Sequence, residues 1–157
     1  MDKSKSVSSS QVVMTQLVLP SHTNALGTVF GGTVMSWIDI AAAIAAQRHS
    51  NKEVVTASID QLNFVAPVKK GWVVNLKASV NFTSRTSMEV GVRVDAENTI
   101  TSEVFHTASA YMTFVALGSD GKPSPVPALI TETEVEKRRY ADAKKRREQR
   151  LSNRTQK

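Results

Sequence analysis

Apolar and polar residues alternate over long stretches in the middle of the chain. In Val90-Gly-Val-Arg-Val-Asp95 the valines occupy every second position, which is the two-residue period of a β-strand with one buried face. Similar runs rich in Val, Thr, Phe and Ile predict strands over residues 12–19, 54–65, 72–84, 87–96 and 104–117. Short turn sequences separate the last four runs, and short connections favour antiparallel neighbours.

One apolar segment, residues 33–47, breaks this pattern and carries a single charged residue, Asp39. It is predicted to be a long helix in the core. A strand, then a helix, then a run of strands indicates an α+β fold with one five-stranded antiparallel sheet wrapped around one central helix. Because such a sheet leaves its edges uncovered, we expect at least a dimer.

Asp39 is the first candidate site residue. An ionised carboxylate without a partner in an apolar interior costs more free energy than the whole stability of a domain. Its side chain must therefore be paired, protonated or directed into a cavity. The alternative is a structural role, in which Asp39 bonds either the hydroxyl of Ser36 one turn away on the same helix or an adjacent chain.

Three glycines, Gly27, Gly31 and Gly32, lie directly before this helix. Free N–H groups at a helix start form a site for negative charge, including charge that develops on a carbonyl oxygen during acyl transfer. The glycines could equally make a tight turn that binds nothing. No Lys-Ser or Lys-Thr follows them, which excludes a phosphate loop of the Walker type.

Composition narrows the class of protein. With 157 residues, 41% of them hydrophobic, the chain is expected to form one globular domain without a membrane span. It contains no cysteine and only three histidines, so neither a metal site nor a cofactor is predicted, and a cytoplasmic location is expected. Residues 1–11 lack the apolar core of a secretory signal and are expected to be a disordered polar tail.

The net charge of +6 comes entirely from residues 134–157, which hold 10 basic and 4 acidic side chains. Thr131-x-x-Glu134 fits a capping box and predicts a basic helix followed by a tail over residues 131–157. Two interpretations of this basic segment are possible. It could be a solvated surface helix, or Lys137 and Arg138 could contact a phosphorylated small molecule. Nucleic acid is not expected, because Tyr140 is the one aromatic residue among the cations.

Several motifs occur together in a fixed order: Asn24-x-x-Gly-x-x-Phe-Gly-Gly32, the helix around Asp39, the strand over 55–64, the turn over 82–89, and a Pro- and Glu-containing segment over 125–134. Together they resemble the hotdog-fold acyl-CoA thioesterases, and most of all the brain-type acyl-CoA hydrolase group. The resemblance spans residues 13–140. It implies a hotdog domain, which we expect over residues 12–130, before the basic helix and tail.

The activity that this resemblance implies is hydrolysis of a fatty acyl-CoA thioester to the free acid and coenzyme A. The family pairs Asn24 of one subunit with Asp39 of another, so a homodimer would hold the complete sites, and a trimer of dimers is the implied larger assembly. Asp39 would act as general base or as nucleophile. Asn24 would orient water or the thioester oxygen, and the N–H groups near Gly31 and Gly32 would stabilise the oxyanion.

The resemblance also implies a coenzyme A site in the turn after the third predicted strand. Its residues are Thr83, Ser84, Arg85, Thr86 and Ser87, of which the Arg85 guanidinium suits phosphate. Lys137 and Arg138 would reach the nucleotide phosphates of a neighbouring subunit. The sequence has Phe30 where many family members have a histidine, so no ring nitrogen is available at that position.

Three other functions fit the sequence less well. A protein that binds acyl-CoA without hydrolysing it would use the same pocket, but it would need neither Asn24 nor Asp39. A hotdog dehydratase would need a histidine in the motif, whereas His22 and His49 flank it. A serine hydrolase of the Gly-x-Ser-x-Gly type is excluded because the chain lacks that motif.

Overall fold

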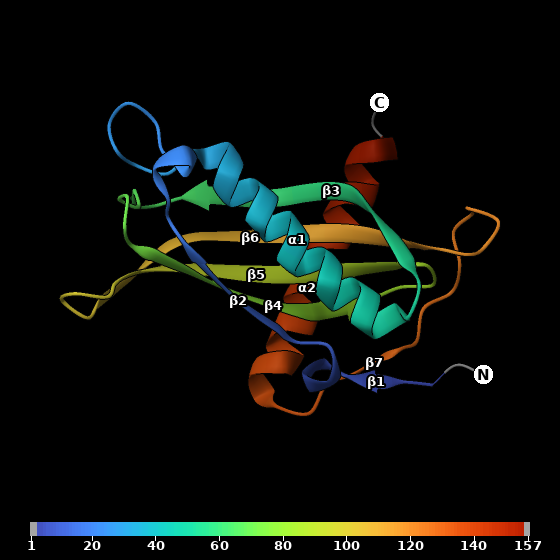
Figure 1. Cartoon of the computed structure of the whole chain (residues 1–157). Helices are drawn as coiled ribbons and strands as arrows, with labels where there is room; N and C mark the ends of the chain where they lie inside the picture. The colour runs from blue at the N-terminus through green and yellow to red at the C-terminus, as the bar shows by residue number, and fades with distance from the viewer. Residues whose placement is uncertain (1–2, 156–157) are drawn as a thin grey trace.

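The computed structural model describes residues 3–155 and contains a five-stranded antiparallel sheet in the order β2-β4-β5-β6-β3. Figure 1 shows the helix α1 (Gly31–Ser50) lying across one face of this sheet and α2 (Glu134–Thr155) behind the other. The predicted α+β architecture is confirmed, and each predicted strand end lies within two residues of the observed one. The strands are β2 (Val12–Leu17), β3 (Glu53–Phe64), β4 (Val73–Thr83), β5 (Ser87–Asn98) and β6 (Glu103–Leu117).

The expectation that every short connection joins neighbouring strands is wrong for β3 and β4. The link over residues 65–72 crosses from one edge of the sheet to the strand next to the opposite edge. Three strand spacings are about 14 Å, a distance that eight residues can span because an extended chain covers about 3.3 Å per residue. As a result β3 is an edge strand, paired only with β6 within residues 3–155.

Small residues on α1 let the helix lie close to the sheet. Ala41, Ala42, Ala45 and Ala46 are fully buried there. The valines and alanines that alternate along β4, β5 and β6 form the other side of this core, together with Met112 and Phe114. Truncating a buried Phe of this kind to Ala lowers the free energy of unfolding by about 3–5 kcal/mol. Packing against this layer therefore holds α1 in its position on the sheet.

The N-terminal segment packs on the domain in the part that the structure describes, residues 3–11. Its strand β1 (Lys5–Ser6) pairs in parallel with β7 (Leu129–Ile130), and a 3₁₀ turn, η1 (Val7–Ser9), follows. Val7 is 3% exposed, and the Lys5 ammonium donates to the Arg48 carbonyl at 3.0 Å. This lysine thus binds a free carbonyl at the C-terminal end of α1, which explains why residues 3–11 are not the disordered tail expected; residues 1–2 lie outside the described part.

The helix α2 begins at Glu134, and its capping box lies two residues later in the sequence than expected. Glu136 accepts hydrogen bonds from the N–H groups of Glu132 and Thr133, while the Thr133 hydroxyl accepts from the Glu136 N–H at 3.1 Å. The capping box is therefore Thr133-x-x-Glu136 and not Thr131-x-x-Glu134. Both pairs fit the same sequence pattern, and only the start of the helix at Glu134 distinguishes them.

The basic helix α2 is not simply solvated, because it is held on the sheet by paired charges and aromatic contacts. Arg146 donates to both carboxylate oxygens of Glu89 at 2.8 and 2.9 Å, and its guanidinium lies 3.6 Å from the centre of the Tyr111 ring. Arg150 donates to Asp60 at 2.7 Å. Burial lowers the pKa of Arg146, but the hydrogen bonds and charge of Glu89 outweigh burial and raise it, so the guanidinium stays charged.

Candidate functional site

The loop before α1 is shaped by the side chain of Asn24. Its Oδ1 accepts hydrogen bonds from the N–H groups of Leu26 and Thr28 at 2.9 and 3.2 Å, and its Nδ2 donates to the Thr28 hydroxyl at 3.0 Å. This is the use of an Asn side chain to stabilise a turn. Gly27 within the turn has a φ of +77°, which only glycine adopts without strain.

The start of α1 leaves backbone donors free. Thr33 and Val34 donate to the carbonyl of Phe30, and the side chain of Phe30, the N-cap residue, makes no capping hydrogen bond. Within residues 3–155 the N–H groups of Gly31 and Gly32 have no acceptor, and both residues are exposed. The positive end of the helix dipole lies at the same place as these two donors. This end of α1 can therefore stabilise negative charge on a bound oxygen.

An apolar pocket of about 290 Å³ lies beside these donors. Its wall includes Gly31 and the side chains of Val34, Phe64 and Val65. Phe64 and Val65 are 48% and 67% exposed in the single chain. A carbonyl oxygen at the helix end could therefore have an aliphatic chain beside it in the pocket.

Asp39 is partly exposed and not buried in the core as expected. Its Oδ1 accepts a 2.8 Å hydrogen bond from the hydroxyl of Thr56 on β3 (Glu53–Phe64). A bond to Ser36, one of the two forms of the structural alternative, is not present, because the Ser36 hydroxyl donates to the carbonyl of Thr33. The pairing with Thr56 was missed by the sequence analysis, since nothing in the sequence distinguishes this threonine from others in the strands.

Asn24 and Asp39 are not joined by any hydrogen bond in the described chain. Gly31 and Asp39 are eight residues apart on one helix, which places them about 12 Å apart along its axis at 1.5 Å per residue. The carboxylate and the free donors of the same chain are therefore too far apart to act on one carbonyl group.

The side of the molecule near Asp39 is open and apolar. The edge strand β3 exposes Ile59 by 42%, and α1 exposes Met35 and Ile40 by 37% and 51%. Several large apolar residues exposed together beside an unpaired strand edge are typical of a surface that another chain covers.

The turn between β4 and β5 contains the five residues predicted to bind coenzyme A, and most of its polar groups already have partners. The hydroxyls of Ser84 and Ser87 bond each other at 2.6 Å, and the Thr83 hydroxyl accepts from the Leu129 N–H. The carbonyls of Arg85 and Thr86 accept from Val126 and Ala116. The exposed guanidinium of Arg85 makes no hydrogen bond within residues 3–155, so it is the one free cation of this turn.

Lys137 and Arg138 belong to α2, whereas Asp39 belongs to α1, and the two helices lie on opposite faces of the sheet (Figure 1). The Lys137 ammonium is 3.3 Å from Glu134 and exposed, whereas Arg138 lines a cleft of about 740 Å³ between α2 and the sheet. One chain does not bring these cations to the Asp39 site. Within the described residues, no group of three or more His, Asp or Glu side chains could hold a metal ion.

Comparison with known proteins identifies the family. The chain belongs to the thioesterase superfamily, whose family model matches residues 26–116. An uncharacterised acyl-CoA thioester hydrolase of Bacillus subtilis is 46% identical over 127 residues, covering 81% of this chain and 74% of that protein. The mouse (Mus musculus) cytosolic acyl coenzyme A thioester hydrolase is 42% identical over 142 residues, or 89% of this chain and 37% of the mouse protein. The chain thus spans little more than a third of the mouse relative.

Solved structures agree with this assignment and confirm the predicted hotdog fold. A hexameric acyl-CoA thioesterase has a TM-score of 0.93 and 45% identity, covering 96% of this chain and 97% of its own. An acyl-CoA hydrolase of Staphylococcus aureus, in complex with butyryl coenzyme A and coenzyme A, has a TM-score of 0.91 and 39% identity over 98% of this chain and 94% of its own. Variants of that hydrolase replace an Asn, an Asp and a Thr by Ala.

No helix within residues 3–155 has both the length and the apolar character that a membrane span requires.

Proposed function

We propose that this protein hydrolyses the thioester of fatty acyl-CoA to a free carboxylic acid and coenzyme A. The observation that carries the proposal is the Asp39 carboxylate, held by the Thr56 hydroxyl at 2.8 Å on the open side of α1. The family assignment supports it. So do the S. aureus variants, since the Asn, Asp and Thr replaced there are spaced 15 and 17 residues apart, as Asn24, Asp39 and Thr56 are here.

Asp39 activates the attack on the thioester carbonyl by one of two routes. As a general base it takes a proton from water, whose oxygen then bonds the carbonyl carbon as the carbon–sulfur bond breaks and the thiolate leaves. As a nucleophile it forms a mixed anhydride, which water later hydrolyses. A single turnover in ¹⁸O-labelled water separates the routes, because only the anhydride route can place the label in Asp39.

The oxyanion donors and Asn24 come from a second copy of the chain in this proposal. The 12 Å helical separation of Gly31 from Asp39, about eight residues at 1.5 Å each, argues against one chain supplying both groups. The exposed edge of β3 provides a surface on which a second copy can pair. A homodimer then contains two sites, each with Asp39 from one copy and Asn24, Gly31 and Gly32 from the other. The hexameric relative supports a trimer of such dimers.

Coenzyme A is held by the turn Thr83, Ser84, Arg85, Thr86 and Ser87, where the free Arg85 guanidinium binds phosphate. Lys137 and Arg138 on α2 bind the nucleotide phosphates of a substrate seated mainly on a neighbouring copy. A cytoplasmic location is proposed from the cytosolic mouse relative and from the absence of cysteine in the sequence.

The test is thiol release from acyl-CoAs of increasing chain length, with the wild type compared to Asp39→Asn. We expect turnover by the wild type and a loss of at least about a hundredfold in kcat for the variant, which is the low end of what a general base contributes. Both proteins are checked for folding and for oligomeric state. Binding of acyl-CoA without turnover by the wild type would instead favour a non-catalytic acyl-CoA sensor.

A further inference from the structure

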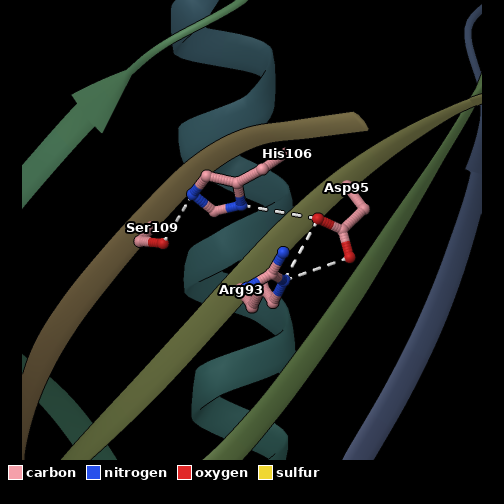
Figure 2. A network of polar contacts seen from close by, with 4 residues as sticks. All are labelled: Arg93, Asp95, His106 and Ser109. Atoms are coloured by element: carbon pink, nitrogen blue, oxygen red, sulfur yellow. Dashed lines mark hydrogen bonds and ion pairs between the residues drawn. The ribbon is translucent and has the colours of Figure 1, made fainter. Parts of the chain in front are cut away.

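A second polar group lies on the outer face of the sheet, opposite to α1. Figure 2 shows Asp95 of β5 and His106 and Ser109 of β6 in a row. The Ser109 hydroxyl lies 3.0 Å from Nε2 of His106, and Nδ1 of His106 lies 3.4 Å from Oδ1 of Asp95. Arg93 donates through Nε to both oxygens of Asp95 at 3.2 Å, so the carboxylate has a charged partner on its other side.

A β-bulge places His106 in this row. Regular alternation would put His106 and Ser109 on opposite faces, because they are three residues apart. The register between β5 and β6 shifts, however: Val94 pairs with Ala108, whereas Asp95 pairs with His106, which leaves Thr107 as an extra residue. A bulge of this kind turns a side chain to the other face and is over-represented next to active sites.

The contacts of His106 indicate which of its two ring nitrogens carries the proton when the imidazole is neutral. Nδ1 faces a carboxylate, which can only accept, so Nδ1 carries the proton. Nε2 is then an acceptor, and the Ser109 hydroxyl donates to it. A nucleophile within hydrogen-bond reach of a base, with the base oriented by a third group, is the geometric signature of an activated serine.

Ser109 also opens onto a cleft with a positive wall. The cleft, of about 740 Å³, lies between α2 and strands β4 to β6, and Lys77, Arg138 and Arg139 line it. None of these three cations has a carboxylate partner within residues 3–155; one acidic residue, Asp142, lines the same cleft. The cleft therefore suits a substrate that carries negative charge.

We propose that Ser109 is the nucleophile of a second acyl-transfer site, with His106 as its base and Asp95 as the group that orients the base. The substrate is an anionic ester or thioester acyl donor bound by the cleft. The Ser109 oxygen bonds the acyl carbon, the bond from that carbon to the leaving oxygen or sulfur breaks, and His106 passes the serine proton to the leaving group. In the second half of the reaction His106 takes a proton from water, and the water oxygen bonds the acyl carbon. The bond from that carbon to the Ser109 oxygen then breaks, the acid leaves, and His106 returns the proton to Ser109.

This site does not depend on the proposed function of Asp39. The two groups lie on opposite faces of the sheet, with α1 covering one face and α2 the other (Figure 1). Replacing Ser109 by Ala is therefore expected to leave thioester turnover at Asp39 unchanged.

The first experiment measures labelling of the full-length protein by a fluorophosphonate probe, followed by intact mass and peptide mapping. We expect a single adduct on Ser109, absent from Ser109→Ala and slowed at least about a hundredfold in His106→Gln, as loss of a general base predicts. Ser79 lines the same cleft and makes no hydrogen bond to a histidine within residues 3–155, so Ser79→Ala is the matched control and should label at the wild-type rate, as should Asp39→Asn.

The second experiment tests the substrate class with two acetyl esters, anionic 4-acetoxybenzoate and neutral phenyl acetate. Ser109 should be acetylated faster by the anionic ester, and Arg139→Gln should reduce this preference while circular dichroism shows an unchanged fold. No adduct on Ser109, an adduct that forms equally fast in folded His106→Gln, or equal rates with the two esters would each overturn the proposal.

Discussion

The hydroxyl of Thr56 donates a 2.8 Å hydrogen bond to Oδ1 of Asp39 and thereby joins the edge strand β3 to the helix α1. Oδ1 has this partner, whereas Oδ2 accepts no hydrogen bond within residues 3–155. The bond fixes the rotation of the carboxylate and leaves one oxygen available for water or substrate. Thr56 is thus a positioning residue for Asp39.

Replacing Thr56 by Val keeps the shape of the side chain but removes the hydroxyl. A hydrogen bond to a charged group contributes about 1.5–3 kcal/mol, so kcat/KM for acyl-CoA should fall about 10- to 150-fold. Thr56→Ser is the matched control, because it keeps the donor, and it should retain most of the activity. Unchanged kcat/KM in a folded Thr56→Val protein would show that this bond does not contribute to turnover by orienting the Asp39 carboxylate.

Ile59 on β3 is expected to lie in the interface between two copies. A lysine there would bring a charge into an apolar seam beside the strand edge, which costs several kcal/mol when the charge is unpaired. Ile59→Lys should therefore be monomeric by light scattering and lack thioester turnover. The control is Ile100→Lys, since Ile100 is 91% exposed in the turn between β5 and β6. If Ile59→Lys keeps the wild-type mass and activity, the interface is elsewhere.

Arg146 and Glu89 form the buried ion pair that holds α2 on the sheet, with side-chain exposures of 13% and 3%. Arg146→Met leaves the Glu89 carboxylate buried without its partner, a change that costs about 3–5 kcal/mol. The matched variant Lys137→Met breaks the exposed pair with Glu134 and should change the free energy of unfolding by about 0.5 kcal/mol or less. Urea denaturation measures both, and equal effects of the two variants would refute the role of Arg146.

His49 makes stability depend on pH. It is fully buried, its Nε2 lies 2.8 Å from the Pro127 carbonyl, and its Nδ1 has no partner in the described chain. Burial lowers the pKa of His49 from 6.5, the Pro127 carbonyl opposes this, and the Lys5 ammonium adds to it. Because the unfolded chain then binds a proton that the folded chain does not, the free energy of unfolding should fall as the pH drops below about 6.5.

The variant His49→Gln isolates this effect, since its amide can still donate to Pro127. The difference in unfolding free energy between wild type and variant should be constant above pH 7.5 and should shift against the wild type between pH 6.5 and the lower pKa of the folded state. Other titrating groups cancel in this difference. A difference that stays flat down to pH 5 would mean that His49 does not titrate as burial requires.

Much of the fold could be predicted from periodicity alone, because strand alternation and one apolar helix are local properties of the sequence. The strands over residues 54–65 and 104–117 and the helix around Asp39 were found in this way. Strand order was not, since the link between β3 and β4 is short enough to suggest neighbours. The docking of α2 was also missed, because Glu89 and Arg146 are 57 residues apart and a run of charges gives no sign of a distant partner.

The candidate site, too, could be predicted from the sequence only in part. Asp39 stands out because it is the one charge in an apolar helix, and the glycines before it indicate free backbone donors. Thr56 carries no such signal, since its role depends on β3 running beside α1. The docked residues 3–11 likewise depend on contacts of Val7 and Lys5 with segments far away in the sequence.

In the proposed homodimer each active site combines Asp39 of one copy with Asn24 of another. The most direct measurement is thiol release from acyl-CoA by a coexpressed, purified mixture of Asn24→Ala and Asp39→Ala, each inactive when expressed alone. Random assembly of equal amounts should restore activity in about a quarter of the sites, because one copy in two supplies each intact residue. No recovery in verified mixed assemblies would rule out a shared site and place both residues of each site in a single chain.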